Sequence, residues 1–224
     1  MINLLRQSGL SVFSAFGCGV LLCFLCGCDP SSSTLREPQS LLDNLQPDTS
    51  GRLPMELLET RLAAWHDSGD TLPANGQKLL AVLADSIPGY LLEIASADTL
   101  QLPLSELVEA RKVFYNPEGD FIELSIGDYV RDADFLRANW RRFNLADSVP
   151  VSGLTEDRRT MPGFLPASLP ASCTWSAYNS LDRSAEVFVI LDARYFVSVS
   201  LPLQDGMPDL STVATWLDWD ALKN

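Results

Sequence analysis

Four of the five cysteines in this 224-residue chain lie within its first 28 positions, where their spacing could suggest metal or redox chemistry. Cys23 and Cys26 have the two-residue spacing of redox and zinc sites, but such sites need folded, partly polar surroundings that stabilise thiolates. Both cysteines instead lie in or beside an uncharged apolar run from Leu10 to Leu25. We therefore interpret the spacing as coincidence and expect no metal and no cofactor there.

The apolar run has the layout of a secretion signal. Its roughly 16 residues are fewer than the about 20 that a helix needs to cross a bilayer, and no basic cluster follows it. The end of the run, Leu25-Cys26-Gly27-Cys28, resembles the lipobox of bacterial lipoproteins, in which the last cysteine receives lipid and becomes the new N-terminus. Cys28 is the matching position, although Cys26 stands where Ala, Ser or Thr is commoner. The alternative is an uncleaved N-terminal anchor.

Lipidation of Cys28 would tether the chain to a membrane. Several acyl chains on one cysteine anchor stably, because each buried methylene contributes about 0.8 kcal/mol. The resemblance implies a cell-envelope location, facing the periplasm or the exterior. In enterobacterial lipoproteins an Asp directly after this cysteine favours retention at the inner membrane, and Asp29 occupies that position. The choice between inner and outer membrane stays open.

The remaining candidates for nucleophile or base chemistry are isolated. Cys173 stands in a predicted strand, so we interpret it as a buried core residue, with a nucleophilic or redox thiol as the alternative. His66 is the single histidine, which excludes sites that need two imidazoles. It ends a predicted helix, as surface and cap residues often do, and a Cys173–His66 dyad is the other reading. The chain has no GxSxG or SxxK motif and no phosphate-binding glycine loop.

Paired acids occur at Asp128, Asp132 and Asp134, and again at Asp218 and Asp220. Neither group has the glycine and distal glutamate of an EF-hand. We interpret the first group as charges near a helix N-terminus and the second as a solvated turn. A weak divalent-cation site is the alternative for both.

Arg137, Arg141 and Arg142 belong to the main concentration of positive charge in an acidic chain. On the helix predicted there, Arg137 and Arg141 are one turn apart and share a face. The abundant acids favour a solvated face with ion pairs. The alternative is a docking patch for an anionic partner, so these three arginines are the candidate partner-binding residues.

The charge balance restricts the partners. The formal net charge is −13, and cleavage before Cys28 would leave 15 basic and 29 acidic side chains, or −14. Such a field repels phosphate backbones and anionic head groups. We expect no nucleic-acid partner, a membrane contact through the lipid on Cys28, and an envelope protein as the partner of the folded domain.

The sequence divides into a signal peptide over residues 1–27, a flexible tether over 28–51 and one α+β domain over 52–224. Residues 28–51 contain four consecutive Ser or Thr residues and several prolines, which is typical of a spacer. Two helices are predicted next, over 53–67 and 75–86. Pro88-Gly89 ends the second helix.

A strand-rich region follows, and its apolar alternation predicts one antiparallel sheet of about six strands. Helices are predicted over 133–142 and after Asp209, which gives two strand-strand-strand-helix halves with the helices packed on a face of the sheet. Residues 144–172 are predicted to be a long irregular loop. The predicted strands are Tyr90–Ala95, Ala110–Tyr115, Asp120–Asp128, Cys173–Tyr178, Ala185–Leu191 and Tyr195–Leu201.

Four segments of this region carry a second resemblance, to a group of uncharacterised bacterial envelope lipoprotein domains without established activity. They are Ile87-Pro88-Gly89-Tyr90, Ala110 to Tyr115, Ile122 to Tyr129, and Ala193 to Val199. The resemblance covers roughly residues 76 to 222. In layout the domain is also similar to Mog1/PsbP-type sandwiches, which implies binding or assembly roles.

Three functional hypotheses follow. The first is a lipid-anchored cell-envelope binding or assembly module without catalysis, since no catalytic or metal-binding motif stands out. The second is a hydrolase-like envelope enzyme that uses carboxylates or Cys173. The third is a structural subunit of a lipoprotein complex. A pocket with converging carboxylates would favour the enzyme, and an exposed apolar patch would favour a partner surface.

Overall fold

The computed structural model describes residues 52–101, 106–146, 153–159, 171–203 and 207–223. By its internal contacts the chain divides into residues 1–35 and 36–224, and every described residue belongs to the second part. The predicted signal peptide, the predicted tether and Cys28 lie outside the described residues. None of the described helices is long and apolar enough to cross a membrane.

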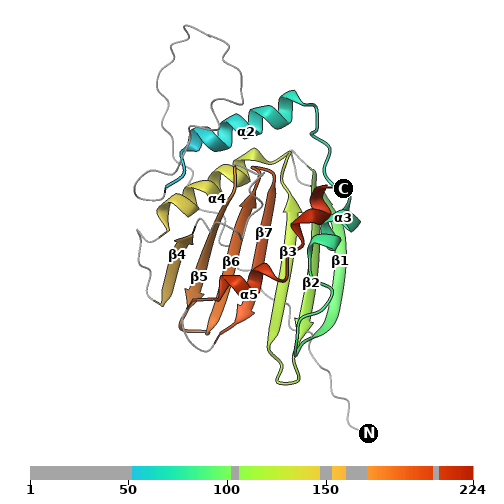
Figure 1. Cartoon of the computed structure of the whole chain (residues 1–224), viewed down its shortest axis with the longest axis vertical. Coiled ribbons are helices and arrows are strands. Elements are labelled where there is room, and N and C mark those ends of the chain that lie inside the picture. Colours follow the sequence, from blue (N-terminus) through green and yellow to red (C-terminus); the bar gives the residue numbers. More distant parts are fainter. Residues whose placement is uncertain (1–51, 102–105, 147–152, 160–170, 204–206, 224) are drawn as a thin grey trace. The chain divides into compact units, whose positions relative to one another are not determined.

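The described part is an α+β fold built on one seven-stranded antiparallel sheet with the order β1-β2-β3-β7-β6-β5-β4 (Figure 1). Two meanders form it, and their last strands β3 and β7 pair with each other at its centre. All six predicted strands are confirmed, and the estimate of about six is one too few. The strands are β1 (Leu91–Gln101), β2 (Glu106–Tyr115), β3 (Phe121–Asp128), β4 (Leu154–Arg159), β5 (Cys173–Asn179), β6 (Ser184–Leu191) and β7 (Tyr195–Pro202).

The seventh strand, β4, lies where the sequence predicts a long loop. Its residues Leu-Thr-Glu-Asp-Arg-Arg show no apolar alternation, because β4 is an edge strand paired only with β5 among the described residues. Edge strands are often polar, which protects them from further pairing. The second half therefore has four strands before its helix, and the predicted repeat of three strands and a helix is wrong there.

Helices cover both faces of the sheet, so the expectation of helices on one face is wrong. Alternate residues of β6 point to opposite sides. Val187 and Val189 pack in a core with α3 (Gly76–Val82) and α5 (Leu210–Ala214). Phe188 and Ile190 pack in a second core with α2 (Met55–Asp67) and α4 (Ala133–Leu145). Because β6 has apolar side chains on both faces of the sheet, helices must pack on both faces to bury them.

Capping residues set where the helices begin. Asp132 accepts a hydrogen bond from the backbone N–H of Phe135 at the start of α4, and Asp209 accepts one from Ser211 at the start of α5. Asn75 caps α3 in the same way, but this helix ends at Val82, four residues earlier than predicted. The chain leaves the helix there because Leu83 forms a bridge with Leu217. A short 3-10 helix, η1 (Trp219–Lys223), ends the described chain.

Gly127 of β3 lies under an aromatic ring. A Cβ atom built there would come within 2.6 Å of the Tyr129 ring and 3.3 Å of Leu107. The ring cannot easily move away, because it stacks on Phe135 with 4.0 Å between centroids and meets Phe196 edge-on. Only glycine fits at this position, because the Tyr129 ring lies too close to the backbone for a Cβ atom.

Gly127→Ala should lower the free energy of unfolding by about 1 to 3 kcal/mol, as overpacking of a core does. Chemical denaturation measures this loss. In a Tyr129→Leu background the ring is absent, so the same glycine substitution should cost clearly less. An equal cost in both backgrounds would show that the ring does not require the glycine.

Candidate functional site

The three candidate arginines lie together on α4, but Arg137 forms ion pairs with Glu59 and Asp134 of the same chain. Its Nε and Nη2 atoms lie 2.7 and 2.9 Å from the two carboxylate oxygens of Glu59 on α2. Nη1 lies 2.9 Å from Asp134. The hydrogen bonds from Arg137 hold the pKa of Glu59 below its usual value. This arginine joins α2 to α4.

Arg142 is also engaged. Its Nη2 atom lies 2.7 Å from Glu156 of β4, and its guanidinium carbon lies 5.0 Å from the centre of the Phe188 ring. Arg141, between these two, is exposed. Two of the three positive charges are therefore offset by acids of the same domain, and a docking role for this helix stays a prediction.

The Cys173 thiol is fully buried and His66 is exposed. Burial raises the pKa of Cys173, so the thiol stays protonated and is a poor nucleophile. The side chain of His66 is 86% exposed at the end of α2, and its Nδ1 lies 3.6 Å from Asp67. These environments favour the interpretations of a core cysteine and a surface histidine over a catalytic dyad.

The acids singled out from the sequence have separate structural partners. Asp132 caps α4 and Asp134 pairs with Arg137, as expected of charges near a helix start. Asp218 accepts a hydrogen bond from the backbone N–H of Asp220 in the C-terminal turn. Among the described residues, no three His, Cys, Asp or Glu side chains form a group that could hold a metal ion.

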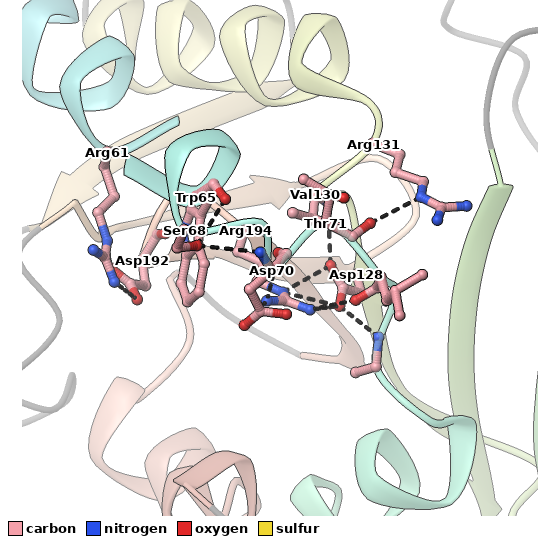
Figure 2. Close-up of polar contacts among 12 residues, drawn as sticks. Arg61, Trp65, Ser68, Asp70, Thr71, Asp128, Val130, Arg131, Asp192 and Arg194 are labelled. Carbon is pink, nitrogen blue, oxygen red and sulfur yellow. Dashed lines mark hydrogen bonds and ion pairs between the residues drawn. The ribbon is translucent and has the colours of Figure 1, made fainter. Parts of the chain in front are cut away.

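Asp128 is different, because it is completely buried in an ion pair with Arg194 (Figure 2). The Nε and Nη2 atoms of Arg194 lie 3.0 and 2.9 Å from the Asp128 carboxylate. The backbone N–H groups of Ala74 and Val130 donate to the same carboxylate at 2.8 and 3.1 Å. Four donor contacts therefore compensate the cost of removing this charge from water.

Arg194 also holds the segment that follows α2. Its Nη2 donates to the carbonyl of Leu72 at 2.8 Å, and Nη1 lies 3.1 Å from the carboxylate of Asp70. The rings of Trp65 and Tyr195 flank the guanidinium, with centroids 4.8 and 5.3 Å from its carbon. Burial opposes the charge, but the hydrogen bonds and attraction to Asp128 outweigh it, so the pKa of Arg194 is raised.

A second ion pair fixes the turn between β6 and β7. Asp192 and Ala193 have φ values of 55° and 50°, a left-handed conformation that costs energy for Ala193. Arg61 of α2 binds the Asp192 carboxylate at 2.6 and 2.7 Å, and the Trp65 indole donates to its carbonyl at 2.9 Å (Figure 2). We call the two ion pairs the Asp128 clamp. Its polar groups bind each other and the backbone, so its role is structural.

A separate group of titratable residues lies on the sheet. Arg111 of β2 lies 2.7 Å from Glu123 of the neighbouring strand β3. Burial, followed by the negative charge of Glu123, raises the pKa of Glu109. Burial also raises the pKa of Glu186 on β6. A carboxyl with a raised pKa could act as a general acid, so these carboxyls favour the enzyme hypothesis.

A pocket of about 340 Å³ lies beside α5, at the end of the β3–β7 pair that is opposite to the Asp128 clamp. This volume is at the lower end of the range for small-molecule sites, which are mostly apolar with a few polar groups. Its lining fits that description, because no charged side chain contributes to it. The lining residues are Ile87, Pro88, Tyr90, Ile122, Leu201, Pro202, Thr212, Thr215 and Trp216.

Local structure explains why these residues converge. Ile87 and Tyr90 form an isolated bridge around the Pro88-Gly89 turn, which the sequence indicates only as a helix stop. Ile122 and Leu201 stand near adjacent ends of β3 and β7, and Trp216 follows α5. The sequence analysis did not predict this pocket.

Asp128→Asn should lower the free energy of unfolding by about 3 to 5 kcal/mol, because it removes the buried counter-charge of Arg194 and leaves only the exposed Asp70. Urea denaturation at neutral pH measures the loss. Asp134→Asn is the matched control, since the Asp134 side chain is 93% exposed and its pairing should contribute less than about 1 kcal/mol. Equal, small losses in the two variants would contradict the clamp.

Comparisons with protein-family models, with curated proteins and with solved structures found no match for this chain. The resemblance around Cys28 to a lipobox, and of residues 76–222 to envelope lipoprotein domains, therefore stays a prediction. So does the likeness to Mog1/PsbP-type sandwiches. The evidence on function is therefore the geometry of the described residues, in which the pocket beside α5 is a candidate ligand site.

Proposed function

We propose that the protein is a lipid-anchored binding or assembly module of the cell envelope. The observation that carries the binding role is the pocket beside α5, an apolar hollow with two threonine hydroxyls at Thr212 and Thr215. The lipobox-like sequence before Cys28 supports the anchor. The net charge of −13 argues that lipid, and not attraction to anionic head groups, holds the protein at the membrane.

Binding is favoured over catalysis by how the reactive side chains are used. Cys173 is buried and protonated, and Asp128 is committed to the clamp. Neither Cys173 nor Asp128 lines the pocket, whose side chains are apolar or hydroxyl-bearing. A ligand in this pocket would be held without meeting a nucleophile or a carboxylate.

An assembly role is favoured by one further feature, the edge strand β1. This strand is 11 residues long, and among the described residues it pairs only with β2. Leu91 is 76% exposed, and Leu92, Ile94 and Leu100 are also exposed. A long apolar edge can accept a strand from another protein. This feature also supports the hypothesis of a structural subunit in a lipoprotein complex.

The anchor is tested by labelling cells that express the full chain with radioactive palmitate. Cys28→Ala should abolish incorporation, because the acceptor thiol is lost. Cys26→Ala is the matched control and should keep its label, since alanine is common at that lipobox position. Persistent labelling of Cys28→Ala would overturn the anchor.

The pocket is tested by affinity capture of the full chain from membranes, with bound small molecules identified by mass. We expect a compound that accompanies the wild type and Thr215→Ser but not Thr215→Trp, whose indole would fill the pocket from its exposed rim. A compound retained equally by all three proteins would place binding elsewhere. Capture without any small molecule would contradict the binding role.

A further inference from the structure

We propose that the pocket beside α5 takes a primary amine attached to an apolar body, and that it rejects the corresponding carboxylate. This inference rests on the proposed binding function and specifies its ligand. Three observations carry it: the apolar floor of the pocket, the direction of its threonine hydrogen bonds, and the excess of carboxylates beside it.

The floor is suited to an apolar body. Ile87, Ile122, Leu201 and Trp216 line it, and each is less than a tenth exposed. Filling the pocket with an aliphatic or aromatic group would remove more apolar surface from water. The Trp216 ring adds a π-system, whose face attracts cations.

Two of the three hydroxyl groups that line the pocket, those of Thr212 and Thr215, are committed as donors, and the third belongs to Tyr90. Thr212 Oγ1 donates to the Asp209 carboxylate at 2.9 Å, and Thr215 Oγ1 donates to the backbone carbonyl of Thr212 at 2.7 Å. A hydroxyl has a single proton but two acceptor lone pairs. While these hydrogen bonds are kept, both threonines can only accept from a ligand, and a donor such as an ammonium N–H suits them.

Carboxylates outnumber positive charges beside the pocket. Asp209 accepts the Thr212 hydroxyl, and hydrogen bonds from Ser211 and Thr212 keep the pKa of its carboxyl below the usual value. An adjoining hollow shares Leu201 and Pro202 with the pocket, and its lining contains Asp120 and Asp182 as well as Arg183. A protonated amine is attracted by this field, whereas a carboxylate is repelled and meets only acceptors on the threonines.

The test titrates the full chain, held in phosphatidylcholine nanodiscs, with n-hexylamine, 1-hexanol and hexanoate. These probes share a six-carbon body and differ only at the head group. Near neutral pH the amine is protonated, as lysine is. Tryptophan fluorescence reports binding, and Trp216→Phe identifies the part of the signal that comes from the pocket; empty nanodiscs correct for partition into lipid.

We expect the amine to bind about tenfold more tightly than hexanoate, with the alcohol between them, as a charge-assisted hydrogen bond in a negative field predicts. Thr215→Val should weaken the amine severalfold and leave hexanoate unchanged, while Thr215→Ser should behave like the wild type. Added salt should reduce the preference.

Hexanoate binding as tightly as the amine would overturn the ligand class while leaving the pocket as a binding site. Binding of none of the probes would also overturn it, and the membrane capture described above then decides whether the pocket binds anything. If Thr215→Val fails to fold, as its far-ultraviolet circular dichroism would show, the ranking of the three probes on the wild type still decides the proposal.

Discussion

The buried ion pair between Asp128 and Arg194 is the constraint on which the rest of the described fold depends. It closes one end of β3 and β7, the two strands that join the meanders at the centre of the sheet. A charge pair without water is stable only when nearly every donor and acceptor has a partner. Here the backbone of the segment after α2 supplies those partners, so satisfying the pair also fixes α2 over the sheet.

The antiparallel pairing of β3 and β7 separates this closed end from an open one. Asp128 is opposite Tyr195 at the clamp, while Ile122 and Leu201 stand at the far end of the same two strands. At the first end, polar residues bind one another and the backbone, and at the second end, mostly buried apolar residues line a pocket. The β3–β7 strand pair thus positions the pocket, and β1 forms one edge of the described sheet.

Local sequence patterns predict much of this fold, but they predict contacts between residues far apart in the chain poorly. The alternation in Ile122-Glu123-Leu124-Ser125-Ile126 and the cap at Asp209 were enough to place β3 and α5. The strand β4 has no such alternation, and the covering of both sheet faces depends on tertiary packing. Asp128 and Arg194 are 66 residues apart, so only the fold brings them together. The pocket is assembled from residues 87–90, 122, 201–202 and 212–216, four segments that are far apart in the chain and whose local patterns do not point to one another.

Hydrogen–deuterium exchange of the full chain, with and without n-hexylamine, tests most directly whether the pocket, the clamp or the arginine-bearing helix is the responsive site. We predict slower exchange in residues 87–90 and 210–217, with no change in 70–74, 191–195 or 133–145. Protection that appears around Arg194 or along α4, and not beside Trp216, would contradict the separation of a structural clamp from a binding pocket.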